Sequence, residues 1–308
     1  MTTAIFDRGE IQILTGRAYA RRVGYFTLMS VISIAGTVVA IKELISNPFD
    51  AVYVLPIEFL ATALGANTAL HMYFTHRAFT TSVIFRGILA LLGTILCQDS
   101  VVQWVANHKR HHRHVDIVSK DPHTPKQFGE SRFAMLTIGL FWASAGWKFS
   151  RIVSSKEFYA RQLLNDPVAR WFDRHFLAVS FAGLWLPFAV GWFVGGENLA
   201  IKWFAYFGAL RVFIGYFFTE FVVNGLCHVI GSRKFNIKGN STNLTFLAPT
   251  TFGATLHHNH HAFPRVLSPA IDGEIDTMNI IYWVLEKMHI IDIEPKPTQI
   301  DINLKKLQ

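Results

Sequence analysis

The sequence predicts an all-α integral membrane protein in which about four transmembrane helices carry a helical cap on the cytosolic side. Composition is the first observation: 51% of the 308 residues are hydrophobic and 16% are charged, whereas a soluble domain has roughly a quarter charged residues. Long stretches without charge are the second, and an uneven distribution of Lys and Arg around them is the third. Together they favour a single membrane domain over residues 1–308, without internal repeats or an appended domain.

Four apolar stretches are long enough to cross the hydrocarbon core of a bilayer, which takes roughly 20 residues. The first stretch has no charged side chain over residues 23–41, and the second has only Glu58. The four spans are predicted at 23–45, 51–70, 176–195 and 200–223.

Two shorter apolar runs, at 87–97 and 133–149, are interpreted as buried or interfacial helices. The first run is too short to span a bilayer and the second is marginal. A crossing at just one of them would put the histidine clusters described below on opposite sides of the membrane, where they could not share a site.

Basic residues predict the orientation. Arg17, Arg21 and Arg22 precede the first span, and the cap segment 71–175 holds fourteen Lys and Arg. By the positive-inside rule, both termini and the cap, which resumes at 224–308, face the cytoplasm, at the inner membrane if the protein is bacterial. The net charge of +8 is therefore a topology signal. Because the charges flank spans and line no groove, membrane lipids are predicted partners and nucleic acid is not.

Nine histidines and one asparagine gather in four short clusters near the ends of the apolar stretches. Two of the clusters share the pattern H-x-x-H-H. The four clusters are His71 and His76; His108, His111 and His112; Asn224 and His228; and His257, His260 and His261. A single cluster would not by itself indicate metal binding, since HKRHH alone could form a solvated basic face. Taken together, the clusters predict one polynuclear metal site.

The spacing of the clusters supports shared metal binding. Residues three and four apart share a helix face, so each H-x-x-H-H cluster can direct its imidazoles broadly together. His71 and His76 are five apart, about 140° around an ideal helix, so their helix could give one imidazole to each of two ions or could unwind there. One zinc ion takes three or four ligands, so nine histidines suit two ions. All-imidazole ligation favours iron, zinc, copper or nickel. Cys97 and Cys227 form no sulfur-ligand motif.

In this order, the clusters resemble the boxes of the membrane fatty-acyl desaturase family, especially its delta-9 acyl-CoA and acyl-lipid branch, the stearoyl-CoA desaturase-like enzymes. The family's H-x4-H, W-x3-H-x-x-H-H, D-P-H, N-x3-H and H-N-x-H-H-x-F-P motifs are matched by residues 71–76, 104–112, 121–123, 224–228 and 257–264. In the last match the asparagine has moved one place along, to Asn259. The resemblance covers roughly residues 25–290.

The resemblance implies an enzyme with two iron ions that uses O2 and two electrons to remove two hydrogens from a fatty-acyl chain. It implies a separate electron donor, such as a ferredoxin or a cytochrome, because no haem, flavin or iron–sulfur motif is visible. It also implies a water-mediated role for Asn224 and no catalytic residue beyond the metal ligands. The implied iron ligands are His71, His76, His108, His111, His112, His228, His257, His260 and His261.

Two departures from the family pattern lie near the expected acyl headgroup. The Arg-Asp pair that precedes the second box in animal members is Ala106-Asn107 here. The glutamate of the usual G-E-x-x-H lead into the third box is Ala254. The carrier of the acyl substrate is therefore left open among CoA, a lipid and acyl carrier protein.

Glu220 is the most informative residue outside the histidines. It lies four residues before Asn224 and eight before His228, so the three lie near one helix face. A carboxylate at membrane depth predicts a functional site, and we expect it to orient ligating imidazoles. The alternatives are a structural partner for Arg211 and a polar group that faces the substrate.

Asp116 and Asp121 are further candidates for contact with ligating imidazoles, and Asp99 is a weaker one. His114 and His258 lie inside the clusters but off the H-x-x-H-H pattern. We expect them to support ligands or to lie at the surface.

The resemblance therefore predicts a desaturase that introduces a cis double bond, near C9, into a saturated acyl chain. A hydroxylase or acetylenase on the same scaffold is the nearest alternative, because the outcome depends on where the carbon lies relative to the irons. A His-rich membrane metal-binding or transport protein is the alternative from another class. It would need ligands along a path at mid-span, whereas these lie at span ends and in the cap.

Overall fold

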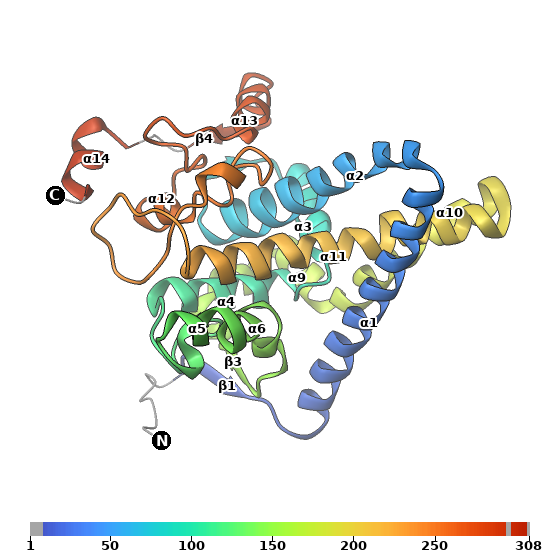
Figure 1. Cartoon of the computed structure of the whole chain (residues 1–308), viewed down its shortest axis with the longest axis horizontal. Helices are drawn as coiled ribbons and strands as arrows, with labels where there is room; N and C mark the ends of the chain where they lie inside the picture. The colour runs from blue at the N-terminus through green and yellow to red at the C-terminus, as the bar shows by residue number, and fades with distance from the viewer. Residues whose placement is uncertain (1–8, 294–296, 307–308) are drawn as a thin grey trace.

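The computed structural model describes residues 9–293 and 297–306, so residues 1–8 and the cap positions 294–296 and 307–308 lie outside it. The chain is helical, as the sequence predicts (Figure 1). Its α-helices are α1 (Gly16–Ser46), α2 (Ala51–Glu58), α3 (Val83–Ile95), α4 (Val101–Arg113), α5 (Arg132–Ala134), α6 (Leu140–Ser144), α7 (Lys156–Tyr159), α8 (Arg161–Leu164), α9 (Pro167–Arg174), α10 (Phe176–Trp203), α11 (Arg211–Tyr216), α12 (His257–Ala262), α13 (Met278–Lys287) and α14 (Gln299–Lys305).

Several of these helices continue into other helical forms. Segments of π-helix are Phe59–Thr75, Met135–Gly139, Phe204–Leu210 and Phe217–Gly225. Turns of 3₁₀-helix are Pro48–Asp50, Pro125–Phe128, Gly146–Phe149, Leu226–His228 and Thr245–Leu247.

Two small antiparallel sheets, which the sequence did not predict, join distant segments of the chain. Strand β1 (Ile11–Ile13) pairs with β3 (Ile152–Ser154), so the segment before α1 is held against the cap. Strand β2 (Phe79–Thr81) pairs with β4 (Ile291–Ile293), so the segment after α13 lies beside the end of the second long helix.

Within the described residues, three helical stretches are long and apolar enough to cross a membrane, which supports a membrane protein: Gly16–Ser46, Pro48–Thr75 and Phe176–His228. They contain the predicted spans 23–45 and 51–70 and, in the third stretch, both 176–195 and 200–223. The runs predicted as non-spanning helices form α3 and the 132–144 segment, which are shorter than a span.

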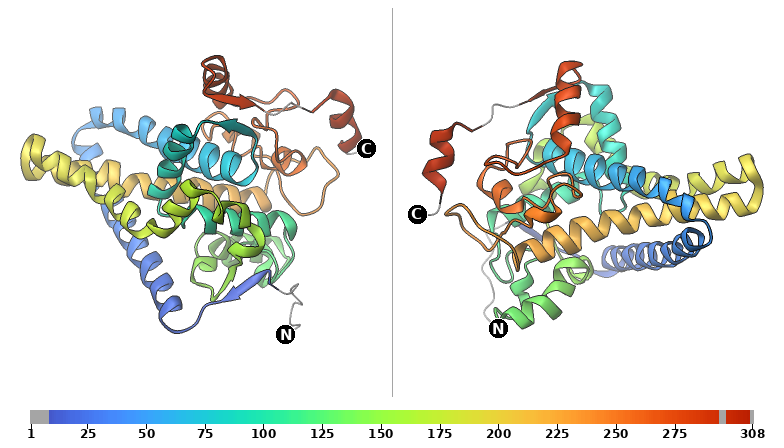
Figure 2. Two further views of the ribbon diagram at one scale, coloured as in Figure 1. Left: turned by 180° about the vertical axis from the view of Figure 1, so that it is seen from behind. Right: turned by 45° about the horizontal axis from the view of Figure 1, so that its top comes forward.

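The third stretch reverses direction at Gly195 and Gly196. Gly196 has a φ of 74°, which lies in the left-handed region that glycine tolerates. A Cβ on Gly191 would lie 2.8 Å from the Cα of Ala200, so the segments before and after the reversal pack closely. Figures 1 and 2 place this turn at the end of the molecule away from α12.

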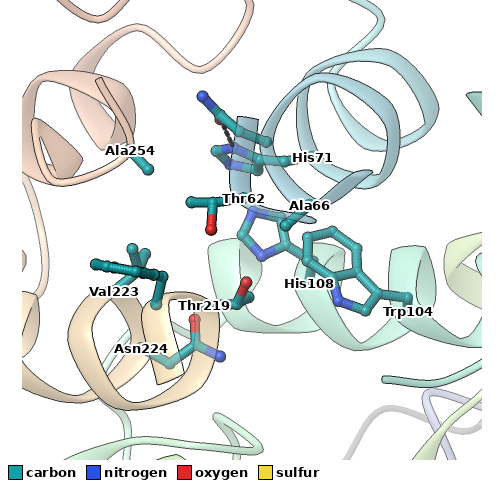
Figure 3. A pocket seen from close by; sticks show the side chains of 11 residues that line it. Thr62, Ala66, His71, Trp104, His108, Thr219, Val223, Asn224 and Ala254 are labelled. Atoms are coloured by element: carbon teal, nitrogen blue, oxygen red, sulfur yellow. Dashed lines mark hydrogen bonds between the residues drawn. The ribbon is translucent and has the colours of Figure 1, made fainter. Parts of the chain in front are cut away.

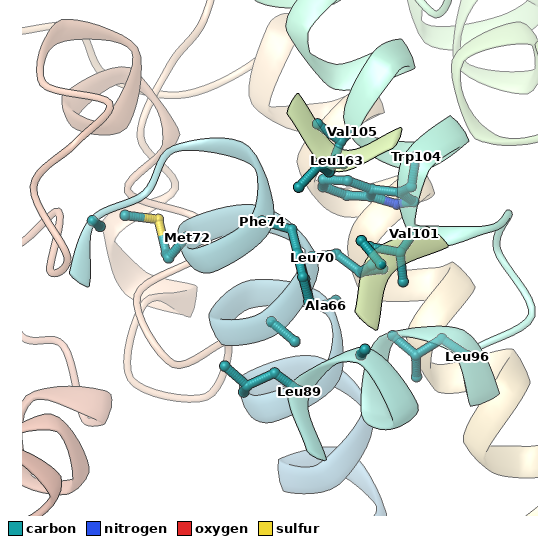
Figure 4. Close-up of a cluster of buried hydrophobic side chains, with 14 of the residues drawn as sticks. Ala66, Leu70, Met72, Phe74, Leu89, Leu96, Val101, Trp104, Val105 and Leu163 are labelled. Carbon is teal, nitrogen blue, oxygen red and sulfur yellow. The ribbon is translucent and has the colours of Figure 1, made fainter. Parts of the chain in front are cut away.

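A buried apolar cluster packs the π-helix Phe59–Thr75 against α3 and α4 (Figure 4). Leu70 and Leu89 belong to it, and a Cβ on Gly93 would lie 2.7 Å from Leu70 Cδ2, so glycine permits the close approach of α3. This packing brings the cap-side end of the π-helix against α4. The first two histidine clusters meet there.

Candidate metal centre

The structure brings all nine predicted histidines into two adjacent groups, whose possible ligand atoms lie within 4.8 Å of one another inside each group. The first group has five side chains and the second has four. The first group is His71, His76, His108, His112 and His260, and the second is His111, His228, His257 and His261.

The π-helix explains how His71 and His76 reach the same group. In a π-helix each backbone N–H bonds to the carbonyl five residues earlier, so positions five apart share a face. The N–H of His76 donates to the carbonyl of His71 at 3.1 Å. The helix therefore widens and does not unwind, and the expectation that it could give one imidazole to each ion is wrong.

Each H-x-x-H-H cluster serves both groups. In α4, His108 and His112 are four residues apart and belong to the first group, while His111 belongs to the second. In α12 the distribution is reversed: His257 and His261 belong to the second group, and the intervening His260 belongs to the first. The two helices therefore link the groups into one centre.

Polar side chains fix the beginnings of these two helices. Ser100 Oγ accepts from the N–H of Gln103 at 3.3 Å and caps α4. Asn243 Oδ1 accepts from the N–H groups of His258 at 2.9 Å and Asn259 at 3.2 Å, at the start of α12. These contacts position both H-x-x-H-H segments.

Carboxylates hold two of the imidazoles at Nδ1. Asp121 accepts from His111 at 2.8 Å, and Asp116 accepts from His228 at 3.0 Å. Burial opposes ionisation of Asp116, but attraction by His228 and the N–H of Asn240 lowers the pKa of this carboxyl below its usual range. Because Nδ1 carries the proton in both histidines, their Nε2 atoms present lone pairs to the centre.

The contacts within the second group suit a cation. Its Nε2 atoms form a chain, from His111 to His261 at 3.2 Å, then to His257 at 3.0 Å and to His228 at 3.1 Å. A neutral imidazole has one N–H. At the two ends of the chain, Nε2 of His111 and Nε2 of His228 have lone pairs and no proton. The two middle imidazoles, if neutral, supply at most two protons for three contacts, so one contact has no proton. Lone pairs directed at one metal ion remove this conflict.

The distances between the imidazole nitrogens also indicate a metal site. Two nitrogens that each lie about 2.1 Å from an ion, at right angles, are about 3.0 Å apart. In the first group, Nε2 of His260 lies 2.9 Å from that of His71 and 3.2 Å from that of His112. His76 Nε2 is buried and has no hydrogen-bond partner among the described residues. The donor set of both groups therefore fits a metal.

Burial favours the neutral form of six of the nine imidazoles. Desolvation, reinforced by the neighbouring imidazoles, lowers the pKa of His111 to about 3. The same causes lower the pKa values of His108, His112, His257, His260 and His261 well below the ordinary range. Neutral imidazole is the form that binds a metal ion, so the centre is ready for a cation at pH 7.

Asn67 contacts a predicted ligand and was missed by sequence reasoning. Its Oδ1 lies 3.2 Å from Nδ1 of His71, and its Nδ2 donates to the carbonyl of Phe252 at 3.1 Å. The asparagine lies four residues before His71 inside an apolar span. A polar side chain at that spacing was the available signal.

Glu220 contacts neither a histidine nor Arg211 within the part of the chain that the structure describes. Its carboxylate pairs with Lys148 at 2.8 Å and accepts from Asn224 Nδ2, also at 2.8 Å. The guanidinium of Arg211 instead donates to backbone carbonyls, including that of Gly183 at 3.0 Å. The expectation that Glu220 contacts a ligating imidazole is therefore wrong, and so is the alternative that it pairs with Arg211.

The remaining candidates lie outside the two groups. Asp99 forms an ion pair with Arg22 at 3.3 Å. His114 lies 2.8 Å from Glu10. His258 is fully buried against Ser241 and Phe235, so it is a structural residue and not a surface one.

An apolar pocket ends at the first histidine group (Figure 3). His71 and His108 form one end of it, and Asn224 lies across the pocket from His71. The other lining residues are Thr62, Ala66, Asn67, Trp104, Phe218, Thr219, Val223 and Ala254. This mostly apolar lining suits contact with part of a hydrocarbon chain next to a metal centre.

Comparison with known proteins agrees with this geometry. A model of the family described as fatty acid desaturase matches residues 51–271. The hex-5-enoyl-[acyl-carrier protein] acetylenase of Moorena producens (strain JHB) is 33% identical over 289 residues, which cover 92% of this chain and 89% of that protein.

Two further relatives match over a shorter region. The sn-1 stearoyl-lipid 9-desaturase of Anabaena variabilis is 29% identical over 203 residues, covering 65% of this chain and 66% of that protein. Stearoyl-CoA desaturase 5 of Bos taurus is 28% identical over 214 residues, covering 67% and 59%. The chain therefore belongs to the fatty acid desaturase family.

Proposed function

We propose that this membrane oxidoreductase is an O2-dependent di-iron desaturase that introduces a cis double bond, near C9, into a saturated fatty-acyl chain. Two groups of five and four imidazoles beside an apolar pocket are the observation that carries the proposal. Removal of two hydrogens from the chain, with two electrons and two protons from elsewhere, reduces O2 to two waters. An unactivated methylene needs a metal cofactor for this step, because acid–base side chains cannot break its C–H bonds.

The two histidine groups would hold one iron ion each. Bound iron would supply the oxidising chemistry with O2. The protein would supply orientation: Asp121 and Asp116 hold His111 and His228 at Nδ1, and Asn67 contacts His71. The apolar pocket would hold the acyl chain and exclude water.

The reversal at Gly195 and Gly196 supports four membrane crossings. It divides the 53-residue stretch Phe176–His228 into two antiparallel helical segments, and each is long enough to cross a bilayer core, which takes roughly 20 residues. An even number of crossings keeps the termini and the histidine clusters on one side. With the positive-inside rule, that side is the cytoplasm.

The substrate carrier and the electron donor belong to the same proposal. Relatives are named for acyl-carrier-protein, lipid and CoA substrates. A separate ferredoxin- or cytochrome-type donor would deliver the electrons. An acidic donor surface would complement the basic cap.

Asp121→Asn is expected to reduce iron affinity or turnover by roughly 10- to 100-fold, because a neutral amide holds the His111 N–H less strongly than a carboxylate does. Iron per chain and product per chain measure the effect. Asp292→Asn, in exposed β4, is the matched control. Iron content and turnover equal to the control in Asp121→Asn would remove Asp121 from the centre.

The reaction is tested with purified protein, a ferredoxin and reductase, and stearoyl groups presented on CoA, on phospholipid and on acyl carrier protein. Gas chromatography with mass spectrometry separates alkene, alkyne and alcohol. We expect an alkene from one of the carriers. No acyl product, together with metal flux in vesicles, would favour a metal transporter and contradict the proposal.

An acetylenase is the second candidate. The relative that matches over 92% of this chain is named as one, and it acts on an acyl chain that already has a double bond. Supplying hex-5-enoyl-acyl carrier protein in the same assay distinguishes the two. A terminal alkyne, without any alkene from saturated chains, would support this candidate and replace the first.

A further inference from the structure

A fully buried ion pair lies beside the pocket. Lys148 Nζ lies 2.8 Å from Glu220 Oε1, and both side chains are 2% exposed. Lys148 belongs to the 3₁₀ turn Gly146–Phe149 of the cap, and Glu220 belongs to the π-helix Phe217–Gly225. The pair therefore joins the cap to the last helical stretch before His228.

A backbone carbonyl and three aromatic rings surround the ammonium group of Lys148. Its ammonium donates to the carbonyl of Gln98 at 2.9 Å. It also lies 4.1 Å from the ring centre of Trp147, 5.4 Å from that of Phe26 and 5.6 Å from that of Tyr216. These contacts stabilise a buried cation, and its ion-pair partner is Glu220.

The second carboxylate oxygen of Glu220 reaches the pocket wall. Glu220 Oε2 accepts from Trp147 Nε1 at 3.3 Å and from Asn224 Nδ2 at 2.8 Å. Because the amide nitrogen is bound to Glu220, the amide oxygen of Asn224 is the atom directed toward the pocket (Figure 3). His71 and His108 line the same pocket.

The orientation of the Asn224 amide decides whether its acceptor oxygen or its donor NH2 group faces the metal centre. An asparagine side chain has an acceptor and a donor end of nearly the same shape, and only its partners fix which end faces which way. The oxygen end can accept from a water molecule bound at a cation. The NH2 end would turn its positive side toward that cation.

We propose that Lys148 and Glu220 form an orienting clamp for Asn224, which keeps the amide oxygen toward the metal centre. The clamp rests on the proposed function of that centre. Glu220 supplies the acceptor for the amide, and Lys148 compensates the charge of Glu220 inside the protein. Both are positioning residues that act through Asn224.

Single substitutions do not isolate this role, because each leaves one charge buried without its partner. Two neutral double variants do. Lys148→Met with Glu220→Gln keeps an acceptor for Asn224 Nδ2, whereas Lys148→Met with Glu220→Leu removes it. Both lack the ion pair, so they differ chiefly in the hydrogen bonds to Asn224 and Trp147, and Asn224→Leu separates the first of these from the second.

We expect both double variants to unfold at similar temperatures. The Gln variant should keep kcat within about fivefold of the wild type, and the Leu variant should lose at least about tenfold in kcat with KM nearly unchanged. Asn224→Leu, which leaves the ion pair intact, should reproduce the loss. Mössbauer spectra of the 57Fe-loaded full-length proteins give a readout apart from turnover: the spectrum of the Leu variant should change and that of the Gln variant should not.

Equal kcat values and equal spectra for the two double variants would overturn the clamp, as would a wild-type spectrum from Asn224→Leu. If the wild type itself bound no iron, both the clamp and the proposed function would be wrong. Iron binding with a normal spectrum in every variant would contradict the clamp alone.

Discussion

His260→Ala and His261→Ala are each expected to reduce acyl product below about 1% of the wild type, although the two residues are adjacent in the sequence. His260 belongs to the group of five imidazoles and His261 to the group of four, so each substitution would remove a donor from a different one of the two proposed ions. Loss of a direct ligand is more severe than the roughly 10- to 100-fold effect of losing a ligand's partner. Product is measured by mass spectrometry of the acyl chains, and iron per chain by elemental analysis.

His175→Ala is the matched control, because His175 is partly exposed and lies against Trp171, outside both groups. It should leave product and iron unchanged. If either His260→Ala or His261→Ala behaved as this control does, the division of the nine histidines between two ions would be wrong.

Lys148→Met alone is expected to destabilise the protein by about 3–5 kcal/mol, because it leaves Glu220 buried without its counter-charge. A loss of this size corresponds to a fall of roughly 10 °C in Tm for a protein of this length. Thermal unfolding followed by fluorescence-detected gel filtration measures it. Adding Glu220→Gln should recover most of the loss, since the unpaired charge is then absent.

Lys287→Met, at the exposed end of α13, provides the comparison and should leave Tm unchanged. An equally unchanged Tm in Lys148→Met would show that the cap and the last helical stretch do not depend on the buried ion pair.

The histidine set could be predicted from the sequence because helix geometry relates spacing to direction. His108 and His112 lie four apart and meet in one group, as a shared helix face requires. Two of the four clusters also lie at the ends of apolar stretches that must begin and end near a membrane surface. Both facts are local and can be read along the chain.

The division between the two groups could not be predicted, because it depends on packing between distant segments. His71 meets His260 across 189 positions of sequence. The sequence spacing of His71 and His76 indicated divergence on an α-helix, but the chain forms a π-helix there, so both point the same way. Intrinsic propensity does not distinguish these two helical forms.

Lys148 could not be connected to Glu220 from the sequence for a related reason. A lysine between aromatic residues in GWKF reads as an interfacial anchor, and nothing local shows its partner 72 positions away. The carboxylate at membrane depth indicated the importance of Glu220. The identity of the cation that compensates it follows only from the fold.

The acyl-chain profile of a host that lacks aerobic desaturation, expressing this protein with iron and a ferredoxin-type donor, is the most direct measurement. We expect new unsaturated acyl chains that require O2 and that disappear with His108→Ala. Unchanged acyl chains, despite iron-loaded protein in the membrane and a reduced donor, would contradict the claim that the nine histidines form the centre of a fatty-acyl desaturase.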